Sequence, residues 1–347
     1  MRALASCLIL LSLWLAGCSD FGRENFPVTP QGTHPVVALR YAPSGERLFV
    51  AGAHFLSYSP DGRALGRALD VTLVQLAVTQ QHVYGIEADP YELLLFDYDG
   101  ACLSCAPETR IPGTVALTPG YGSLVASADG STVVAALVAQ EGAAPQVVRL
   151  VPGATGAQAL GAVLYTGEVR ALTLSPDGAL LLLSLPGGQV EARDAHTGEV
   201  RWHYAGGSSA ERPPVAAVYW TTSPAPFAAL AATLPLQPLG TLDPATGALT
   251  LLDAEQRGLQ LSHDAPPVAT TQDGRFLFGR EEVGQRRQVG ALSRYDVQRR
   301  AFAPLLEQGA FNALALSPDG ARLAVSRGTE IATYSVEELL GAPALSR

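Results

Sequence analysis

The feature that most constrains this chain is a repeated pattern of short apolar runs and tight turns, clearest over residues 169–204. There, two apolar runs flank the turn Ser-Pro-Asp-Gly at 175–178, and two alternating segments flank a second turn at 194–198. Runs of this length between turn residues predict four short strands in an antiparallel meander. The first two runs are almost wholly apolar, which is expected of strands covered on both faces.

The spacing of turn glycines shows that the pattern recurs along most of the chain. Gly130 and Gly178 are 48 residues apart, Gly178 and Gly274 are 96 apart, and Gly274 and Gly320 are 46 apart. A period in the forties that contains four strands is typical of a β-propeller, whose blades cannot bury their faces alone. We count seven repeats. The sequence therefore predicts an all-β, seven-bladed β-propeller of four-stranded antiparallel blades over residues 36–343.

The turns and one longer motif carry resemblances to known families. The Ser-Pro-Asp-Gly turns at 175–178 and 317–320 resemble those of WD-repeat-like and YVTN-type bacterial propellers, which implies a fold and not a ligand. Residues 194–202, Asp-Ala-His-Thr-Gly-Glu-Val-Arg-Trp, are similar to the quinoprotein repeat that outer-membrane assembly lipoproteins share. The related segment 243–250 has Thr-Gly but no Trp, so neither a quinone cofactor nor the assembly role is expected from this resemblance.

The first residues resemble the signal of a bacterial lipoprotein. Arg2 precedes an apolar run over residues 3–15, which is too short to span a bilayer, and Leu-Ala-Gly-Cys at 15–18 resembles a lipobox. We therefore expect a signal peptide at 1–17, lipidation of Cys18 and a lipidated tether at 18–35. The alternative is an ordinary secretory signal with an incidental cysteine. Ser19, rather than Asp, follows the cysteine, which favours the outer membrane, on its periplasmic or surface face, over the inner membrane.

The seventh repeat lacks a fourth strand in the sequence. After Ser335 the pattern of the earlier repeats is not completed before the chain ends. We hypothesise that residues 21–28 supply the outermost strand of the last blade, because closure of a ring by both termini removes a sheet edge.

Cys102 and Cys105 are the two cysteines of the expected mature chain besides Cys18. Ala106 follows the second cysteine where a c-type haem site needs His, and neither a zinc site nor a thioredoxin-like pair has its context here. In an oxidising compartment we expect a local disulfide between Cys102 and Cys105, which requires a bend in the chain.

Charge argues against one class of partner. The formal net charge is -9, and no cluster of basic residues occurs in the sequence. Nucleic-acid binding depends on a concentrated positive patch, so we expect no nucleic-acid partner.

No arrangement of residues in the sequence predicts a catalytic centre, and we assign no catalytic, cofactor-binding or metal-binding residue. Glu87, Glu141 and Glu330 could in principle converge on the axis of the ring as ligands of a divalent metal. The sequence therefore favours a lipid-anchored envelope propeller that binds another protein or envelope component without catalysis. The alternative is a metal-dependent lactonase-like or hydrolase-like propeller. Loops on a rigid ring are usual binding sites, and the longest are expected at 108–122, 205–214, 253–267 and 280–290.

Overall fold

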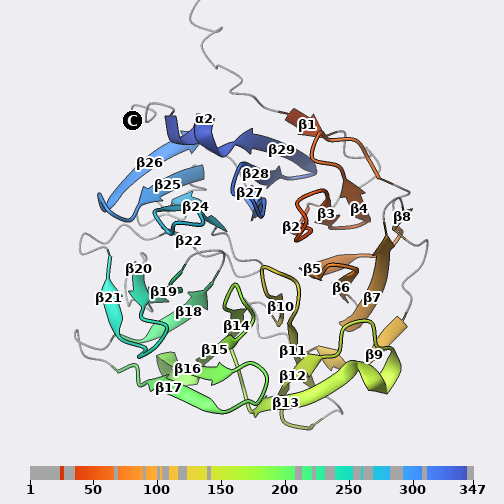
Figure 1. Cartoon of the computed structure of the whole chain (residues 1–347), viewed down its shortest axis with the longest axis vertical. Helices are drawn as coiled ribbons and strands as arrows, with labels where there is room; N and C mark the ends of the chain where they lie inside the picture. The colour runs from red at the N-terminus through yellow and green to blue at the C-terminus, as the bar shows by residue number, and fades with distance from the viewer. Residues whose placement is uncertain are drawn as a thin grey trace, which may run out of the picture.

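The computed structural model describes most of the chain from residue 24 to residue 341. The described residues are 24–26, 36–65, 69–88, 91–99, 102–103, 109–115, 123–138, 142–207, 213–220, 224–230, 239–252, 259–260, 269–281, 292–306 and 311–341. They form seven antiparallel blades around a central axis, and the chain visits the blades in order (Figure 1). Blades 2 and 3 are joined by hydrogen bonds into one nine-stranded sheet.

The first three blades occupy the first half of the ring. Blade 1 contains β2 (Ala38–Tyr41), β3 (Leu48–Ala51) and β4 (Phe55–Tyr58), with isolated bridges that place residues 64 and 69 beside β4. Blade 2 contains β5 (Leu73–Val78), β6 (His82–Glu87), β7 (Glu92–Asp99) and β9 (Thr109–Val115), with the short β8 (Cys102–Leu103) beside β7. Blade 3 contains β10 (Leu124–Ala126), β11 (Val133–Val138), β12 (Gln146–Leu150) and β13 (Leu160–Thr166).

The last four blades complete the ring. Blade 4 contains β14 (Ala171–Leu174), β15 (Leu180–Leu185), β16 (Gln189–Asp194) and β17 (Val200–Tyr204). Blade 5 contains β18 (Val215–Tyr219), β19 (Phe227–Leu230), β20 (Leu239–Leu242) and β21 (Leu249–Leu251). Blade 6 contains β23 (Ala269–Thr270), β24 (Phe276–Glu281), β25 (Leu292–Asp296) and β26 (Ala301–Leu306), with β22 (Leu259–Gln260) beside β24. Blade 7 contains β27 (Phe311–Leu316), β28 (Arg322–Arg327) and β29 (Glu330–Ser335).

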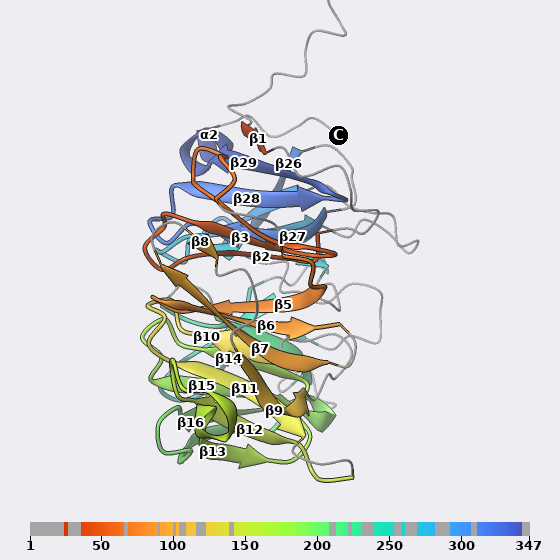
Figure 2. The ribbon, with the colours of Figure 1, turned by 90° about the vertical axis from the view of Figure 1, so that its right-hand side faces the viewer.

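The fourth strand of blade 7 comes from the other end of the chain. β1 (Glu24–Phe26) pairs antiparallel with β29, with Glu24 opposite Thr333 and Phe26 opposite Ile331. Figure 2 shows β1 at the outer edge of the ring beside β29. The short helix α2 (Val336–Gly341) follows β29, and the Arg294 guanidinium of blade 6 donates hydrogen bonds to the carbonyls of Leu339 and Leu340. The sheet of blade 7 therefore combines the first and the last strand of the described chain.

The hydrophobic core is divided among the interfaces between neighbouring blades. Seven clusters of buried side chains are found in the described residues, one at each of the seven interfaces around the ring. In β15, Leu181 and Leu183 pack against blade 3, whereas Leu182 packs against blade 5. Successive side chains of a strand point to opposite faces, so a strand between two blades must be apolar at every position. This confirms the interpretation of the apolar runs in the sequence.

One expected loop is a strand. Residues 108–122 were expected to form a loop, but 109–115 form β9, the outer strand of blade 2. Glu92 lies opposite Thr114 and Leu93 opposite Ile111, so the register shifts at Pro112-Gly113. The end of β9 also pairs with the end of β11, and this links the edge of blade 2 to blade 3. Such a strand is difficult to predict from sequence, because Pro and Gly are rare in strands except at bulges.

Candidate functional site

One face of the ring carries the turns between the first and second strands of the blades, which we call the turn ring (residues 42–45, 79–82, 127–130, 175–178, 271–274 and 317–320). In the turn of blade 4, the Ser175 hydroxyl donates to Asp177 Oδ1 at 2.6 Å, and the Ala179 backbone N–H donates to the same oxygen at 3.1 Å. Equivalent bonds join Ser127 to Asp129, Thr271 to Asp273 and Ser317 to Asp319. These bonds fix the shape of each turn, so the repeated aspartates have a structural role.

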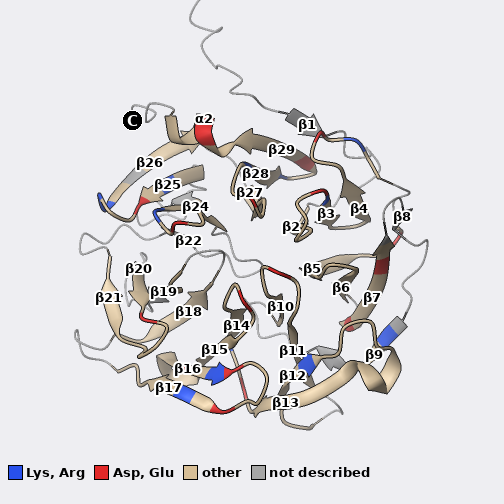
Figure 3. Cartoon of the chain, in the orientation of Figure 1, with Lys and Arg blue, Asp and Glu red and all other residues tan. Residues whose placement is uncertain are grey.

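The same bonds keep the turn carboxylates ionised. The hydroxyl of Ser175 lowers the pKa of Asp177 below its ordinary value, and the N–H of Ala179 lowers this pKa further. Asp273 and Asp319 have their pKa values lowered in the same way, first by Thr271 and Ser317. Figure 3 shows acidic residues on the turns next to β10 and β14. The turn ring therefore presents exposed negative charge around the axis.

The turns contact one another through side chains as well. The amide of Gln272 in blade 6 donates to the carbonyl of Pro318 in blade 7, and that of Gln80 in blade 2 donates to the carbonyl of Asp129 in blade 3 at 3.0 Å. These bonds cross from one blade to the next. The turn ring is thus a rigid rim around the axis.

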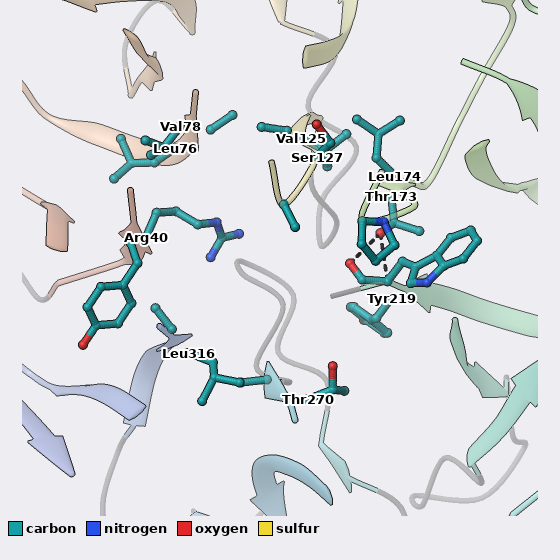
Figure 4. A pocket seen from close by; sticks show the side chains of 18 of the residues that line it. Arg40, Leu76, Val78, Val125, Ser127, Thr173, Leu174, Tyr219, Thr270 and Leu316 are labelled. Atoms are coloured by element: carbon teal, nitrogen blue, oxygen red, sulfur yellow. Dashed lines mark hydrogen bonds between the residues drawn. The ribbon is translucent and has the colours of Figure 1, made fainter. Parts of the chain in front are cut away.

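Inside this rim, the first strands of all seven blades enclose a cavity of about 500 Å³ on the axis. This volume lies within the range of small-molecule sites, roughly 300–1,000 Å³. The lining is mostly apolar, and Figure 4 shows side chains from different blades facing the same space, among them Leu76, Val125, Leu174, Tyr219, Thr270 and Leu316. We call this space the axial cavity.

Several polar groups of the lining are already hydrogen-bonded within the protein. The backbone N–H of Trp220 donates to Thr173 Oγ1 at 2.8 Å, and the Thr173 hydroxyl lies 3.2 Å from the carbonyl of Trp220. The side-chain oxygen of Gln75 accepts from the backbone N–H of Ser123 at 3.1 Å. These bonds join neighbouring blades, so much of the polar lining is engaged in holding the ring together.

Arg40 is the one charged side chain among the described residues that line the axial cavity. Its guanidinium points from β2 toward the middle of the cavity (Figure 4). Nη1 donates to the carbonyl of Leu39 at 2.9 Å, and no carboxylate of the described residues pairs with it. A guanidinium has five N–H donors, so this single bond leaves most of them without an acceptor among the described residues. Removal from bulk water lowers the pKa of Arg40 below its ordinary value.

Arg40 also breaks the repeat. In five blades the turn begins at a residue whose backbone N–H bonds to the carbonyl five residues later, and these residues are Ala42, Ser127, Ser175, Thr271 and Ser317. The residues two places before them are, in the same order, Arg40, Val125, Thr173, Ala269 and Ala315. Four of the five are small and uncharged. Sequence reasoning missed Arg40, although aligning the repeats on their turns could have found it.

The glutamates that could have converged as metal ligands are not brought together on the axis. Glu87 lies 3.2 Å from Arg110, Glu92 pairs with the same guanidinium, and Glu330 is an exposed residue at the start of β29. Neither Glu87 nor Glu330 lines the axial cavity, and Glu141 lies outside the described residues. In the described parts of the chain, no three His, Cys, Asp or Glu residues lie close enough to hold a metal ion.

The predicted cysteine sites lie largely outside the described residues. Cys18 and Cys105 are both outside them, so lipidation and the disulfide stay predictions. Cys102 begins β8, which pairs antiparallel with the end of β7, with Asp99 opposite Cys102. The bend that the disulfide requires lies outside the described residues.

The motif that is similar to the quinoprotein repeat joins two blades. Trp202 Nε1–H donates to the carbonyl of Pro244 in blade 5 at 2.8 Å. A Cβ atom on Gly247 would lie 2.5 Å from Cε3 of the same indole. Asp194 accepts backbone N–H groups from His196 and Thr197, and its carboxylate pairs with Arg201 at 2.6 Å. The residues of this motif are therefore engaged in a turn and in packing between blades 4 and 5.

Comparisons with solved structures agree with this architecture. The Swd1 (Cps50) β-propeller domain of Myceliophteria thermophila matches with a TM-score of 0.59 at 14% identity, over 90% of this chain and 99% of that chain. Hydrazine synthase of Kuenenia stuttgartiensis matches with a TM-score of 0.61 at 15% identity, over 89% and 98%. The shared fold is the β-propeller. At these identities the likeness concerns the propeller fold alone.

No family model and no curated protein matches the sequence. Within the described part of the propeller, no helix has the length and apolar character that a membrane span requires.

Proposed function

We propose that this propeller is a lipid-anchored, non-catalytic binding scaffold of the bacterial cell envelope, with another protein or envelope component as its partner. The observation that carries the proposal is the pairing of β1 with β29. Glu24 follows Cys18 by six positions, and an extended chain spans at most about 3.5 Å per residue. A lipid on Cys18 would therefore hold the outer edge of blade 7 within about 20 Å of the membrane surface.

The architecture supports a binding role in two ways. First, the closed ring presents fixed turns and loops, and binding residues are often held on loops by such a rigid scaffold. Second, the described residues that line the axial cavity include no Asp, Glu or His that could act as a general acid or base there. Binding chemistry is therefore better supported than catalysis. The outer membrane, on its periplasmic or surface face, is the site we propose, because Ser19 follows the cysteine.

Anchoring is tested by expressing the full chain and a Cys18→Ser variant in a bacterial host. We expect the parent protein to fractionate with membranes and its first mature peptide to carry acyl chains, and we expect the variant to lack both properties. A parent protein without acyl chains would overturn the anchor and leave the scaffold standing.

Binding is tested separately by placing a photoreactive residue at Asp177 on the turn ring or at Glu330 on the opposite face, because both residues are exposed. Illumination in cells should give a discrete protein adduct from one face only. That adduct should persist through purification, and an excess of the unmodified protein should reduce the amount of adduct that forms. Absence of a competable adduct from both faces would overturn the scaffold function, whatever the result for the anchor.

A further inference from the structure

From the axial cavity we infer a second site, independent of any protein partner: the cavity binds a small amphipathic carboxylate, and Arg40 pairs with its carboxylate group. The inference stands on three features, namely the cavity, its apolar lining and a guanidinium within it that pairs with no carboxylate of the described residues.

The first step concerns the cost of placing Arg40 where it is. A charged group inside an apolar space is unfavourable unless it is paired and hydrogen-bonded. Among the described residues, the guanidinium meets one carbonyl, that of Leu39, and no carboxylate. The equivalent positions in four other blades hold Val125, Thr173, Ala269 and Ala315, so the ring does not need a long cation there. A bound anion would supply the missing partner.

The second step concerns the shape of the anion. A guanidinium presents a planar fork of donors that matches a carboxylate, with which it forms two parallel hydrogen bonds. The rest of the cavity offers apolar side chains such as Leu76, Val125, Leu174 and Leu316. A ligand with one carboxylate and an apolar body satisfies both parts. A ligand with several charges would leave all but one of them against apolar walls.

The third step concerns the charge at the mouth of the cavity. The turns that contain Asp129, Asp177, Asp273 and Asp319 contribute a neighbouring residue to the lining of the cavity, and all four carboxylates are exposed. Exposed charges are screened over about 8 Å at physiological ionic strength. None of these four carboxylates forms an ion pair with Arg40, and their charge would favour a cation at the mouth. If an anion, a neutral molecule and a cation of the same shape are compared, the effect of the guanidinium on binding can be distinguished from the effect of the carboxylates at the mouth.

The test uses residues 19–347, which contain every described element of the closed ring. This protein is titrated calorimetrically with octanoate, octan-1-ol and octylammonium, which share one alkyl chain and differ in the charge of the head group. We expect one octanoate per protein, bound about 10- to 100-fold more tightly than octan-1-ol, because hydrogen bonds to a charged group are worth about 1.5–3 kcal/mol. Octylammonium should bind more weakly than octan-1-ol.

Variants assign the effect to one residue. Arg40→Met keeps an unbranched side chain but removes the charge and the donors, and it should bind octanoate no more tightly than octan-1-ol. Arg40→Lys keeps the charge without the fork and should retain part of the preference. Arg63→Gln, which removes an exposed arginine of the same blade, should leave the preference unchanged.

Two results would overturn the inference. One is a parent protein that binds octanoate no more tightly than octan-1-ol, and the other is an Arg40→Met variant that keeps the full preference. Preferred binding of octylammonium would assign the site to the carboxylates of the turn ring instead. If Arg40→Met does not fold, as judged by circular dichroism, the parent protein and Arg40→Lys decide the question.

Discussion

Removing β1 should destabilise the whole ring, although the strand has only three residues. Its three residue pairs with β29 would be lost, and the edge of β29 would be exposed, including Ile331 and Thr333, which are now buried. Each net hydrogen bond contributes about 0.5–1.5 kcal/mol, so three pairs correspond to about 2–4 kcal/mol. A change of 1 kcal/mol shifts the Tm of a domain of about 150–250 residues by about 2–4 °C, and that of a longer ring by less. At about 1.5 °C per kcal/mol for a ring of about 300 residues, we expect the Tm to fall by about 3–6 °C.

The assay is calorimetric melting of residues 19–347 and of the same protein starting at residue 31. The matched control replaces residues 19–23 by a Gly/Ser segment of equal length and retains Glu24, Asn25 and Phe26. Its Tm should equal that of the parent. An unchanged Tm after deletion of β1 would refute the reasoning, since the pairing would then contribute nothing to the closed ring. An equal fall in the control would assign the effect to the preceding residues instead.

Two further predictions concern the turns. Gly247→Ala should lower the free energy of unfolding by more than about 2 kcal/mol in a urea titration, because φ is +72° and the added Cβ would lie 2.5 Å from Trp202. Gly142→Ala is the control, because φ is +81° there and no atom lies within 4 Å of the added Cβ, so the change should cost only about 1 kcal/mol. Equal costs at the two positions would contradict the packing argument. Asp177→Asn should be less stable than the parent at pH 7, because the folded protein lowers the pKa of Asp177 and an ionised carboxylate is therefore stabilised above the ordinary pKa of about 4. This difference should shrink as the pH falls below about 4 and the parent carboxylate becomes protonated; a difference independent of pH would refute the assignment.

The sequence predicts the propeller because each repeat contains the residue types that its strands and turns require. A strand between two blades must be apolar on both sides, as Leu181, Leu182 and Leu183 are. Four of the six turns in the turn ring have a hydroxyl, a carboxylate and a glycine in fixed order, as Ser175, Asp177 and Gly178 do. β9 was missed for the converse reason. Pro112 and Gly113 interrupt its pattern, and they are accommodated only because the register shifts at that point.

The axial cavity could not be predicted in the same way. Its lining comes from seven strands that are far apart in the sequence, and each contributes only a few side chains that resemble other core residues. Arg40 is recognised as unusual only when its position in the first strand of blade 1 is compared with the equivalent position in other blades. Two of the glutamates that could in principle converge on the axis do not line the cavity: Glu87 shares Arg110 with Glu92, and Glu330 lies at the start of β29. Glu141 lies outside the described residues.

The pairing of Glu24 with Thr333 has a consequence for how the chain folds. These two residues are 309 positions apart, so the last sheet cannot be completed until almost the whole polypeptide has been synthesised. Contacts between distant parts of a chain form slowly, because the entropy of a long loop must be lost before the contacts stabilise it. Until then β29 has an open edge, which is a template for pairing with another chain. The slowest and most aggregation-prone step of folding is therefore the meeting of the first strand with the last.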